Sequence, residues 1–232
     1  MKKLIPIFLL FSNIIFAVNF EADLYASAGL QYTIYKGFKQ PIIKTTGFIG
    51  GEFGVYGCLG ANFDIPNNTL KNISTLIDFG YCKTSFSTIA KIDEGDLGNS
   101  REYHEVVSTF FDTIYLGFLG KLNFNKNFSF GIGAGVMFPF SGFTTGTMMD
   151  DIVRFSSREI KDAYSKAVMP YIKASFESKK ILTDKLSFIY GLSLFYNFGL
   201  KTKIIEKSIK MSGIGISIFA GISFGDQNKV IV

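Results

Sequence analysis

The 232-residue sequence contains no tryptophan, a single histidine at position 104 and only two cysteines. His104 and its neighbour Glu105 sit in or beside a charged stretch, where we expect an exposed loop residue rather than a catalytic one. No cluster of histidine, cysteine and acidic residues has metal-ligand spacing, and no phosphate-binding loop is present. We therefore expect no catalytic residue, no cofactor site and no metal site.

Long apolar runs and a strong net charge are missing as well. Beyond the N-terminus, no segment reaches the roughly 18 continuous apolar residues that a membrane helix needs. Yet 47% of the residues are hydrophobic and the mean hydropathy is +0.27. The formal net charge of +5 is small and evenly spread, which argues against a nucleic-acid partner.

The N-terminus has the layout of a secretory signal peptide. Lys2 and Lys3 precede an apolar run from Leu4 to Phe16, and Ala17 follows as a cleavage residue. We expect residues 1–17 to be cleaved, which lowers the formal charge of +5 by two, to +3; an uncleaved anchor is the alternative. Residues 18–232 are predicted to form a single domain.

What the sequence has in abundance is two-residue alternation. Residues 127–140 read NFSFGIGAGVMFPF. The even positions from Phe128 to Phe140 are all apolar, the odd positions from Ser129 to Pro139 are mostly small, and neither set carries a charge. Because successive side chains of a β-strand point to opposite faces, this pattern predicts a strand with one large apolar face and one small, uncharged face.

Seven further segments alternate in a similar way, the third and fourth less cleanly than the others. The predicted strands are residues 24–35, 45–63, 76–90, 107–122, 128–140, 168–177, 186–200 and 212–225. They contain only seven charged residues, which are Glu52, Asp78, Lys83, Asp112, Lys121, Lys173 and Glu177. A bulge near Lys83 would remove that lysine from an apolar face, and Asp112 is expected at a membrane edge or past a bulge.

The apolar faces are predicted to contact lipid. A charge on the lipid face near the midplane costs about 2–4 kcal/mol, which explains why charges collect in the connections. The rival fold is a soluble lipocalin-like barrel, which would expose the uncharged, glycine-rich faces to water. It would also place all the large apolar side chains in the interior, which is only just wide enough in an eight-stranded barrel to hold side chains. We predict an all-β fold, an eight-stranded antiparallel up-and-down transmembrane β-barrel.

In such a barrel both chain ends lie on the periplasmic side. The extracellular loops are then expected near residues 36–44, 91–106, 141–167 and 201–211. Ser156 and Glu159 have capping-box spacing, which indicates a short helix in the third loop. Aromatic residues near the strand ends are predicted to form girdles at the two membrane boundaries, including Phe128, Phe138, Phe140, Phe176, Phe188, Phe198 and Phe224.

The opposite faces define the lumen, where four charged side chains are expected: Glu52, Asp78, Lys173 and Glu177. Buried charges need partners, so Lys173 is predicted to pair with an acid. If Asp64 lies opposite Leu76, then Cys58 lies opposite Cys82, and a disulfide can form after export; two buried thiols are the alternative.

The signal peptide, the eight alternating strands and the last strand, GIGISIFAGISF ending at Phe224, resemble small bacterial outer-membrane barrels of the eight-stranded OmpA-like and OmpX-like type. The resemblance covers the whole chain. It implies a place in the bacterial outer membrane among its lipids, and recognition of the last strand by the barrel assembly machinery. The eight residues after Phe224 depart from a family that often ends at the aromatic residue.

These observations predict a monomeric, non-enzymatic barrel with a lumen filled by side chains. It would act as a structural or adhesin-like protein whose outer loops contact a host or envelope partner. The first alternative is a narrow channel. The second is a lipid-modifying enzyme, although Val106 stands where the His-x-Ser spacing of the lipid A deacylases would place the serine after His104 and Glu105.

Overall fold

The computed structural model describes residues 18–37, 43–65, 69–94, 101–124, 127–147, 152–202 and 209–225. The predicted signal peptide, residues 1–17, lies outside the described residues. The described elements are β1 (Val18–Lys36), β2 (Ile43–Asp64), β3 (Asn72–Glu94), β4 (Arg101–Asn123), β5 (Phe128–Gly146), β6 (Val153–Ser156), α2 (Ser157–Ala163), β7 (Met169–Thr183), β8 (Leu186–Lys201) and β9 (Lys210–Gly225).

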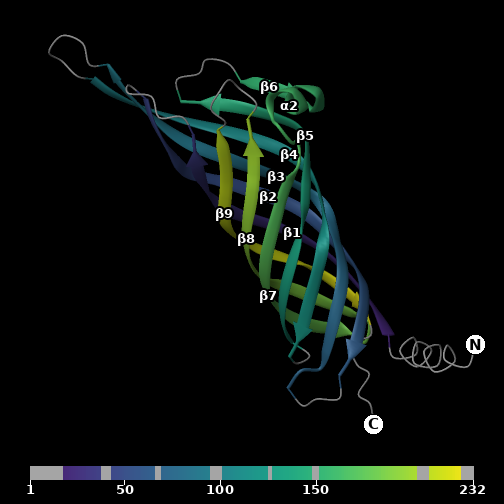
Figure 1. Ribbon diagram of the computed structural model, residues 1–232. Coiled ribbons are helices and arrows are strands. Elements are labelled where there is room, and N and C mark those ends of the chain that lie inside the picture. Colours follow the sequence, from purple (N-terminus) through teal and green to yellow (C-terminus); the bar gives the residue numbers. More distant parts are fainter. Residues whose placement is uncertain are drawn as a thin grey trace, which may run out of the picture.

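Eight of these strands close into an antiparallel ring (Figure 1). The order around the ring is β4-β3-β2-β1-β9-β8-β7-β5, and the pairing of β4 with β5 closes it. Each strand of the ring pairs with the ring strands before and after it in the chain, and the first strand, β1, pairs with the last, β9. β6 lies outside this order and pairs with the later part of β5. The predicted eight-stranded up-and-down barrel is therefore confirmed.

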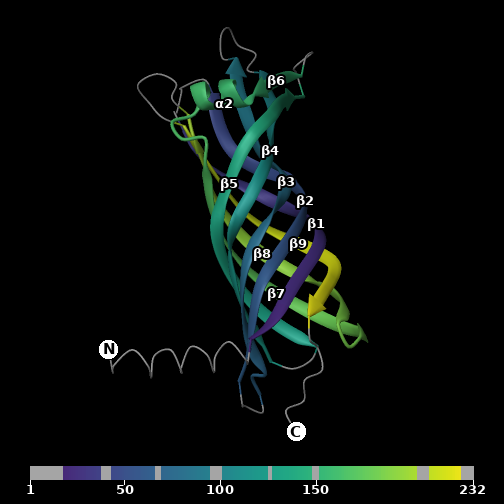
Figure 2. The same cartoon turned by 90° about the vertical axis from the view of Figure 1, so that its right-hand side faces the viewer.

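The two ends of the barrel differ, and we name them by their connections. At the turn end lie the short β2–β3, β4–β5 and β7–β8 connections and the paired ends of β1 and β9, where Glu21 is opposite Gly225. At the loop end, β2, β3 and β4 run on past the other strands as a projecting sheet (Figures 1 and 2). The predicted loop 91–106 is wrong in its extent, because β3 continues to Glu94 and β4 begins at Arg101.

The faces of the strands alternate as the sequence predicts. Along β5, Phe128, Ile132 and Phe138 are exposed on the outside, while Ser129, Gly131 and Gly133 are buried in the lumen. Small residues leave room inside: a Cβ added at Gly135 would collide with the hydroxyl of Tyr171, which reaches across from β7. An apolar outer surface and an interior rich in polar and charged side chains are the reverse of a soluble barrel.

Two irregularities in the strand pairing affect the outward charges. The β2–β3 register shifts between Phe48 and Glu52, and the Ser85 hydroxyl accepts from Gly51 N at 2.7 Å and donates to Gly51 O at 2.9 Å. The extra residue thus lies in β2, so the bulge expected near Lys83 in β3 is wrong.

Lys83 instead keeps the outward phase and forms an ion pair of 3.3 Å with Asp112. Asp112 does sit at a register shift, before Thr113, as predicted. Its carboxylate also accepts from Tyr81 at 2.5 Å and from Ser141 at 2.7 Å. The two outward charges therefore neutralise each other.

Within the described ranges, no helix is both long enough and apolar enough to cross a membrane.

Candidate functional site: a lumen closed at both ends

Five charged side chains from three parts of the ring meet at the turn end of the lumen. We call Glu21, Asp23, Lys121, Glu177 and Lys179 the inner ion cluster. Lys121 Nζ contacts Asp23, and lies 3.3 Å from Glu21 Oε1 and 3.0 Å from Glu177 Oε2. Lys179 Nζ lies 3.2 Å from Glu21 and 3.3 Å from Glu177. Each of the five side chains is at most 8% exposed, so the cluster fills the lumen with paired charges.

Polar side chains extend this cluster towards the turns. Ser74 donates to Glu21, and Asn123 donates to Ser74 at 3.0 Å. Ser129 in turn donates to Asn123. Buried charges are tolerated only when their hydrogen-bonding capacity is met, and this chain of donors meets much of it across β3, β4 and β5.

Of the inner ion cluster, sequence reasoning placed only Glu177 in the lumen. Glu21, Asp23 and Lys179 fall just outside the predicted strands, and Lys121 was counted in its strand without being assigned to the lumen. Strand parity carries the missing signal, because Glu21 and Asp23 share a face with lumenal Ser27. The strand pairing continues beyond the predicted strand ends, so the interior reaches further than the sequence predicts.

The middle of the lumen is filled by tyrosines around one ion pair. Asp78 pairs with Lys173, as the sequence predicts for that lysine, and Tyr25 donates to Asp78 at 3.4 Å. Lys173 Nζ also lies 5.2 Å from the centre of the Tyr115 ring. Ring contacts continue across the barrel in the stacked Tyr25–Tyr56 pair at 5.3 Å and the stacked Tyr115–Tyr171 pair at 4.3 Å.

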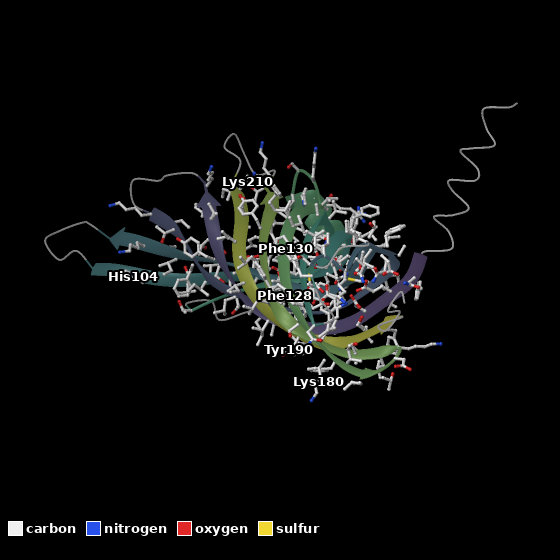
Figure 3. All side chains as sticks on the ribbon, turned by 90° about the horizontal axis from the view of Figure 1, so that it is seen from below. His104, Phe128, Phe130, Lys180, Tyr190 and Lys210 are labelled. Carbon is white, nitrogen blue, oxygen red and sulfur yellow. The ribbon has the colours of Figure 1, made fainter. Side chains whose placement is uncertain are left out.

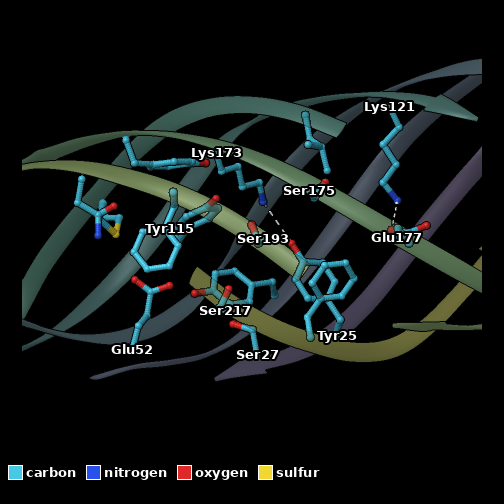
Figure 4. Close-up of a pocket in the computed structure, with 17 residues that line it drawn as sticks. Tyr25, Ser27, Glu52, Tyr115, Lys121, Lys173, Ser175, Glu177, Ser193 and Ser217 are labelled. Atoms are coloured by element: carbon cyan, nitrogen blue, oxygen red, sulfur yellow. Dashed lines mark hydrogen bonds and ion pairs between the residues drawn. The ribbon is translucent and has the colours of Figure 1, made fainter. Parts of the chain in front are cut away.

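A small cavity remains between these side chains (Figure 4). Its volume is about 40 Å³, and a water needs roughly 10–15 Å³ on this measure, so it has room for about three waters. Glu52 lines it together with Ser27, Ser193 and Asn197. All four charged residues predicted for the lumen are therefore inside the barrel.

At the loop end, α2 lies across the mouth of the barrel (Figure 2). Its Ile160 is 1% exposed and packs in one cluster with Phe86, Phe111 and Leu200. Tyr164, just after the helix, meets Phe111 edge to face at 5.8 Å. Ser165 N donates to Lys201 O at 2.8 Å, which ties the segment to β8. We call this apolar group the outer plug.

The predicted capping box of α2 is present. Ser156 is the N-cap: its Oγ accepts from Glu159 N at 3.4 Å, and its own backbone N donates to Glu159 Oε2 at 2.6 Å. This hydrogen bond to the charged carboxylate holds the pKa of Glu159 below its ordinary value. The cap fixes where the helix begins and so positions Ile160 over the lumen.

The expected disulfide is wrong, because the β2–β3 register is shifted by four residues. Asp64 lies opposite Asn72, which places Cys58 opposite Asp78 and Cys82 opposite Gly54. Both thiols are free and fully buried in the lumen. Cys58 Sγ lies 3.5 Å from Asp78 Oδ1, and Cys82 Sγ lies 2.8 Å from Thr113 Oγ1.

The seven predicted girdle residues all face outward. Their side chains are between 39% and 45% exposed: Phe128, Phe138, Phe140, Phe176, Phe188, Phe198 and Phe224. Phe128 is labelled in Figure 3 together with Tyr190 of β8, which is 48% exposed. Their role at the membrane boundaries stays a prediction.

His104 lies on the projecting part of β4, away from the lumen (Figure 3). It is exposed and faces Lys91 across the β3–β4 pairing. Among the described residues, no three His, Cys, Asp or Glu side chains come together as a metal site.

No protein-family model matches this chain, and no curated protein matches it. Solved structures do resemble it. The outer membrane protease OmpT from Escherichia coli is 10% identical, with 89% of this chain and 96% of that one covered and a TM-score of 0.41. The outer membrane protein OprG from Pseudomonas aeruginosa is 13% identical, with 90% and 96% covered and a TM-score of 0.39.

A third is Ail, the attachment invasion locus protein of Yersinia pestis, at 12% identity, 86% and 97% coverage and a TM-score of 0.30. At such identities the likeness concerns fold type alone. The closed ring and its apolar outer surface already establish that type from this chain's own residues. The chain folds as an eight-stranded antiparallel transmembrane β-barrel.

Proposed function

We propose that this protein is a non-conducting, non-enzymatic outer-membrane barrel that acts at the cell surface through its loop end. The observation that carries the proposal is the double closure of the lumen. The inner ion cluster fills one end, the outer plug fills the other, and the cavity between them has a volume of about 40 Å³. A pore would need a continuous polar path, whereas the outer plug is apolar.

The projecting sheet supports a role at the surface. The β3–β4 pairing runs to Glu94 and Arg101, whereas β5 pairs with β4 only as far as Val107. Because a transmembrane strand needs only about 9–11 residues, strands of 22 and 23 residues extend well beyond the bilayer. Long connections of outer-membrane barrels lie outside the cell, so the loop end is the surface that a host or envelope partner would meet.

The non-enzymatic part of the proposal rests on the position of the one histidine. His104 is exposed on the projecting sheet, far from Glu52, the acid that lines the small cavity. The other lumenal acids, Glu21, Asp23, Asp78 and Glu177, are paired with Lys121, Lys173 or Lys179. Acid–base catalysis needs its groups within reach of one another and of a substrate. We expect His104→Ala to leave the acyl pattern of lipid A unchanged.

Two experiments test the proposal, one for the surface role and one for the closed lumen. The first replaces residues 90–105 with an Asn-Gly turn that joins the native partners Ile89 and Val106, and compares binding of whole cells to host extracellular matrix with that of wild-type cells. We expect most binding to be lost, while heat-modifiable gel mobility shows that the variant barrel is folded. Equal binding by the two cell types would remove the projecting sheet from the proposal.

The second experiment measures single-channel conductance of the refolded protein in a planar bilayer. We expect no open steps from the wild-type barrel. Reproducible open steps would replace this proposal by the narrow-channel alternative.

A further inference from the structure

The described methionines gather beside one cysteine. The chain has six methionines, and the three within the described residues are Met137, Met169 and Met211. Cys82, Met137 and Met169 are buried in one cluster, and Met211 packs against it. We call these four residues the sulfur cluster. They come from β3, β5, β7 and β9, so the closure of the barrel brings them together.

Two of the sulfur atoms are in direct contact. Cys82 Sγ lies 3.8 Å from Met137 Sδ, and Met169 is directly opposite Met137 across the β5–β7 pairing. Thr113 holds the cysteine in place, because its hydroxyl lies 2.8 Å from Cys82 Sγ and donates to Cys82 O at 2.9 Å. The thiol therefore lies between the Thr113 hydroxyl and the Met137 thioether.

We propose that the sulfur cluster is a binding site for one soft monovalent metal ion of the Cu(I) class. Thiolate and thioether sulfurs are the ligands that select Cu(I). Two metal–sulfur bonds of about 2.3 Å spanning the 3.8 Å between Cys82 and Met137 enclose an angle of about 110°. Met169, opposite Met137 across the β5–β7 pairing, is the candidate third ligand.

The charge balance suits this apolar place. When the ion binds, the Cys82 thiol gives its proton to water, and the thiolate and the monovalent ion together are neutral. A neutral pair can be buried beside Phe86, Phe111 and Ile160, whereas a divalent ion would leave a net charge there. Met137 also lines the small cavity, which provides water to take the proton.

Cys58 is a matched control within the same lumen. It is as deeply buried as Cys82, but its neighbours are the Asp78 carboxylate at 3.5 Å and the Tyr25 hydroxyl at 4.0 Å. These are oxygen atoms, which soft ions bind poorly. The two cysteines thus differ in their second ligand and not in their exposure.

The site is tested on the refolded, reduced barrel in detergent. Ag(I) is titrated directly, and Cu(I) is titrated in competition with a Cu(I) chelator. We expect one ion per chain, at least a hundredfold weaker binding in Cys82→Ser, at least tenfold weaker binding in Met137→Leu, and unchanged binding in Cys58→Ser. X-ray absorption of the Cu(I) form is expected to show sulfur neighbours.

Any of three results would overturn the site. They are no binding of either ion by the wild type, equal loss of binding in Cys58→Ser and Cys82→Ser, or full binding by Met137→Leu. Heat-modifiable mobility confirms folding of each variant. If Cys82→Ser does not fold, Met137→Leu and Cys58→Ser still decide the matter, because leucine keeps the volume of methionine without its sulfur.

Discussion

The two closures of the lumen are built from opposite chemistry. The inner ion cluster fixes the turn end with ammonium and carboxylate groups at hydrogen-bonding distance, whereas the outer plug fills the loop end with Phe86, Phe111 and Ile160. A charge network depends on each of its members, because removing one leaves its partners buried and unpaired. An apolar plug depends on volume and loses stability in smaller steps.

The largest expected effect follows from Lys121→Met. Lys121 contacts three carboxylates, and its removal leaves Glu21, Asp23 and Glu177 with only Lys179 nearby. We expect the free energy of unfolding to fall by about 3–5 kcal/mol, the usual cost of breaking a buried ion pair. Urea unfolding in micelles measures this free energy. A loss under 1 kcal/mol would mean that water reaches the inner ion cluster and solvates its charges.

A smaller loss is expected from Ile160→Ala in the outer plug. Truncating a buried isoleucine costs about 2–5 kcal/mol, and here the cost falls on the docking of α2 rather than on the whole barrel. The readout is trypsin cleavage at exposed Arg154 and Arg158, which should become at least tenfold faster. Ile152→Ala, at a residue that is 56% exposed, is the control and should leave the rate unchanged.

Ser156→Ala should weaken the same segment by less. Loss of an N-cap side chain costs about 0.5–2 kcal/mol, so trypsin cleavage at Arg158 should accelerate by less than in Ile160→Ala. The order of the two rates is the test, and a faster rate in Ser156→Ala would show that the cap outweighs the packing of Ile160.

Acid should loosen α2 through Glu159. Because the folded state holds the pKa of Glu159 below its ordinary value of 4.5, the stabilisation is complete above that value and is lost as the pH falls below it. The protection factors of residues 157–163, which are exchange rates corrected for the intrinsic rate at each pH, should therefore fall below pH 4.5 in the wild type. Glu159→Gln should show no such pH dependence.

The smallest effect is expected from Lys83→Met on the outer surface. The Lys83 side chain is 41% exposed, and its ion pair with Asp112 spans 3.3 Å. Asp112 keeps its hydrogen bonds from Tyr81 and Ser141, and an ion pair in contact with water, as expected for Asp112 at the membrane edge, contributes about 0–1 kcal/mol. Unfolding in urea should thus change by less than 1 kcal/mol, and a loss comparable with that of Lys121→Met would erase the contrast between lumen and surface.

Sequence alone was enough to predict the barrel, because lipid on one side and packed side chains on the other impose the same alternation on every strand. It could not predict the strand ends. Past Tyr25 and Glu177 the lumenal positions become charged, and charged residues are typical of connections as well as of a polar lumen, so the pattern predicts no strand at Glu21, Asp23 and Lys179. The capping box was readable because its two members are local, only three residues apart.

The β2–β3 register was also beyond the sequence. A turn is indicated by Asp64, Pro66, Asn67 and Asn68, but these residues do not show which position lies at its centre. The predicted partner of Asp64 is Leu76, whereas the structure pairs it with Asn72. This difference of four residues separates the two cysteines. The sulfur cluster was invisible for a related reason. Its members are far apart in sequence, and no local motif joins them.

The two native cysteines test the central claim, a lumen closed at both ends. Cys58 lies directly opposite Asp23 of the inner ion cluster, and Cys82 touches Met137 near the outer plug. Labelling with a small methanethiosulfonate reagent, without metal or reductant, should modify neither thiol in the folded barrel and both after denaturation. Rapid labelling of either cysteine in the folded barrel would contradict the closed lumen.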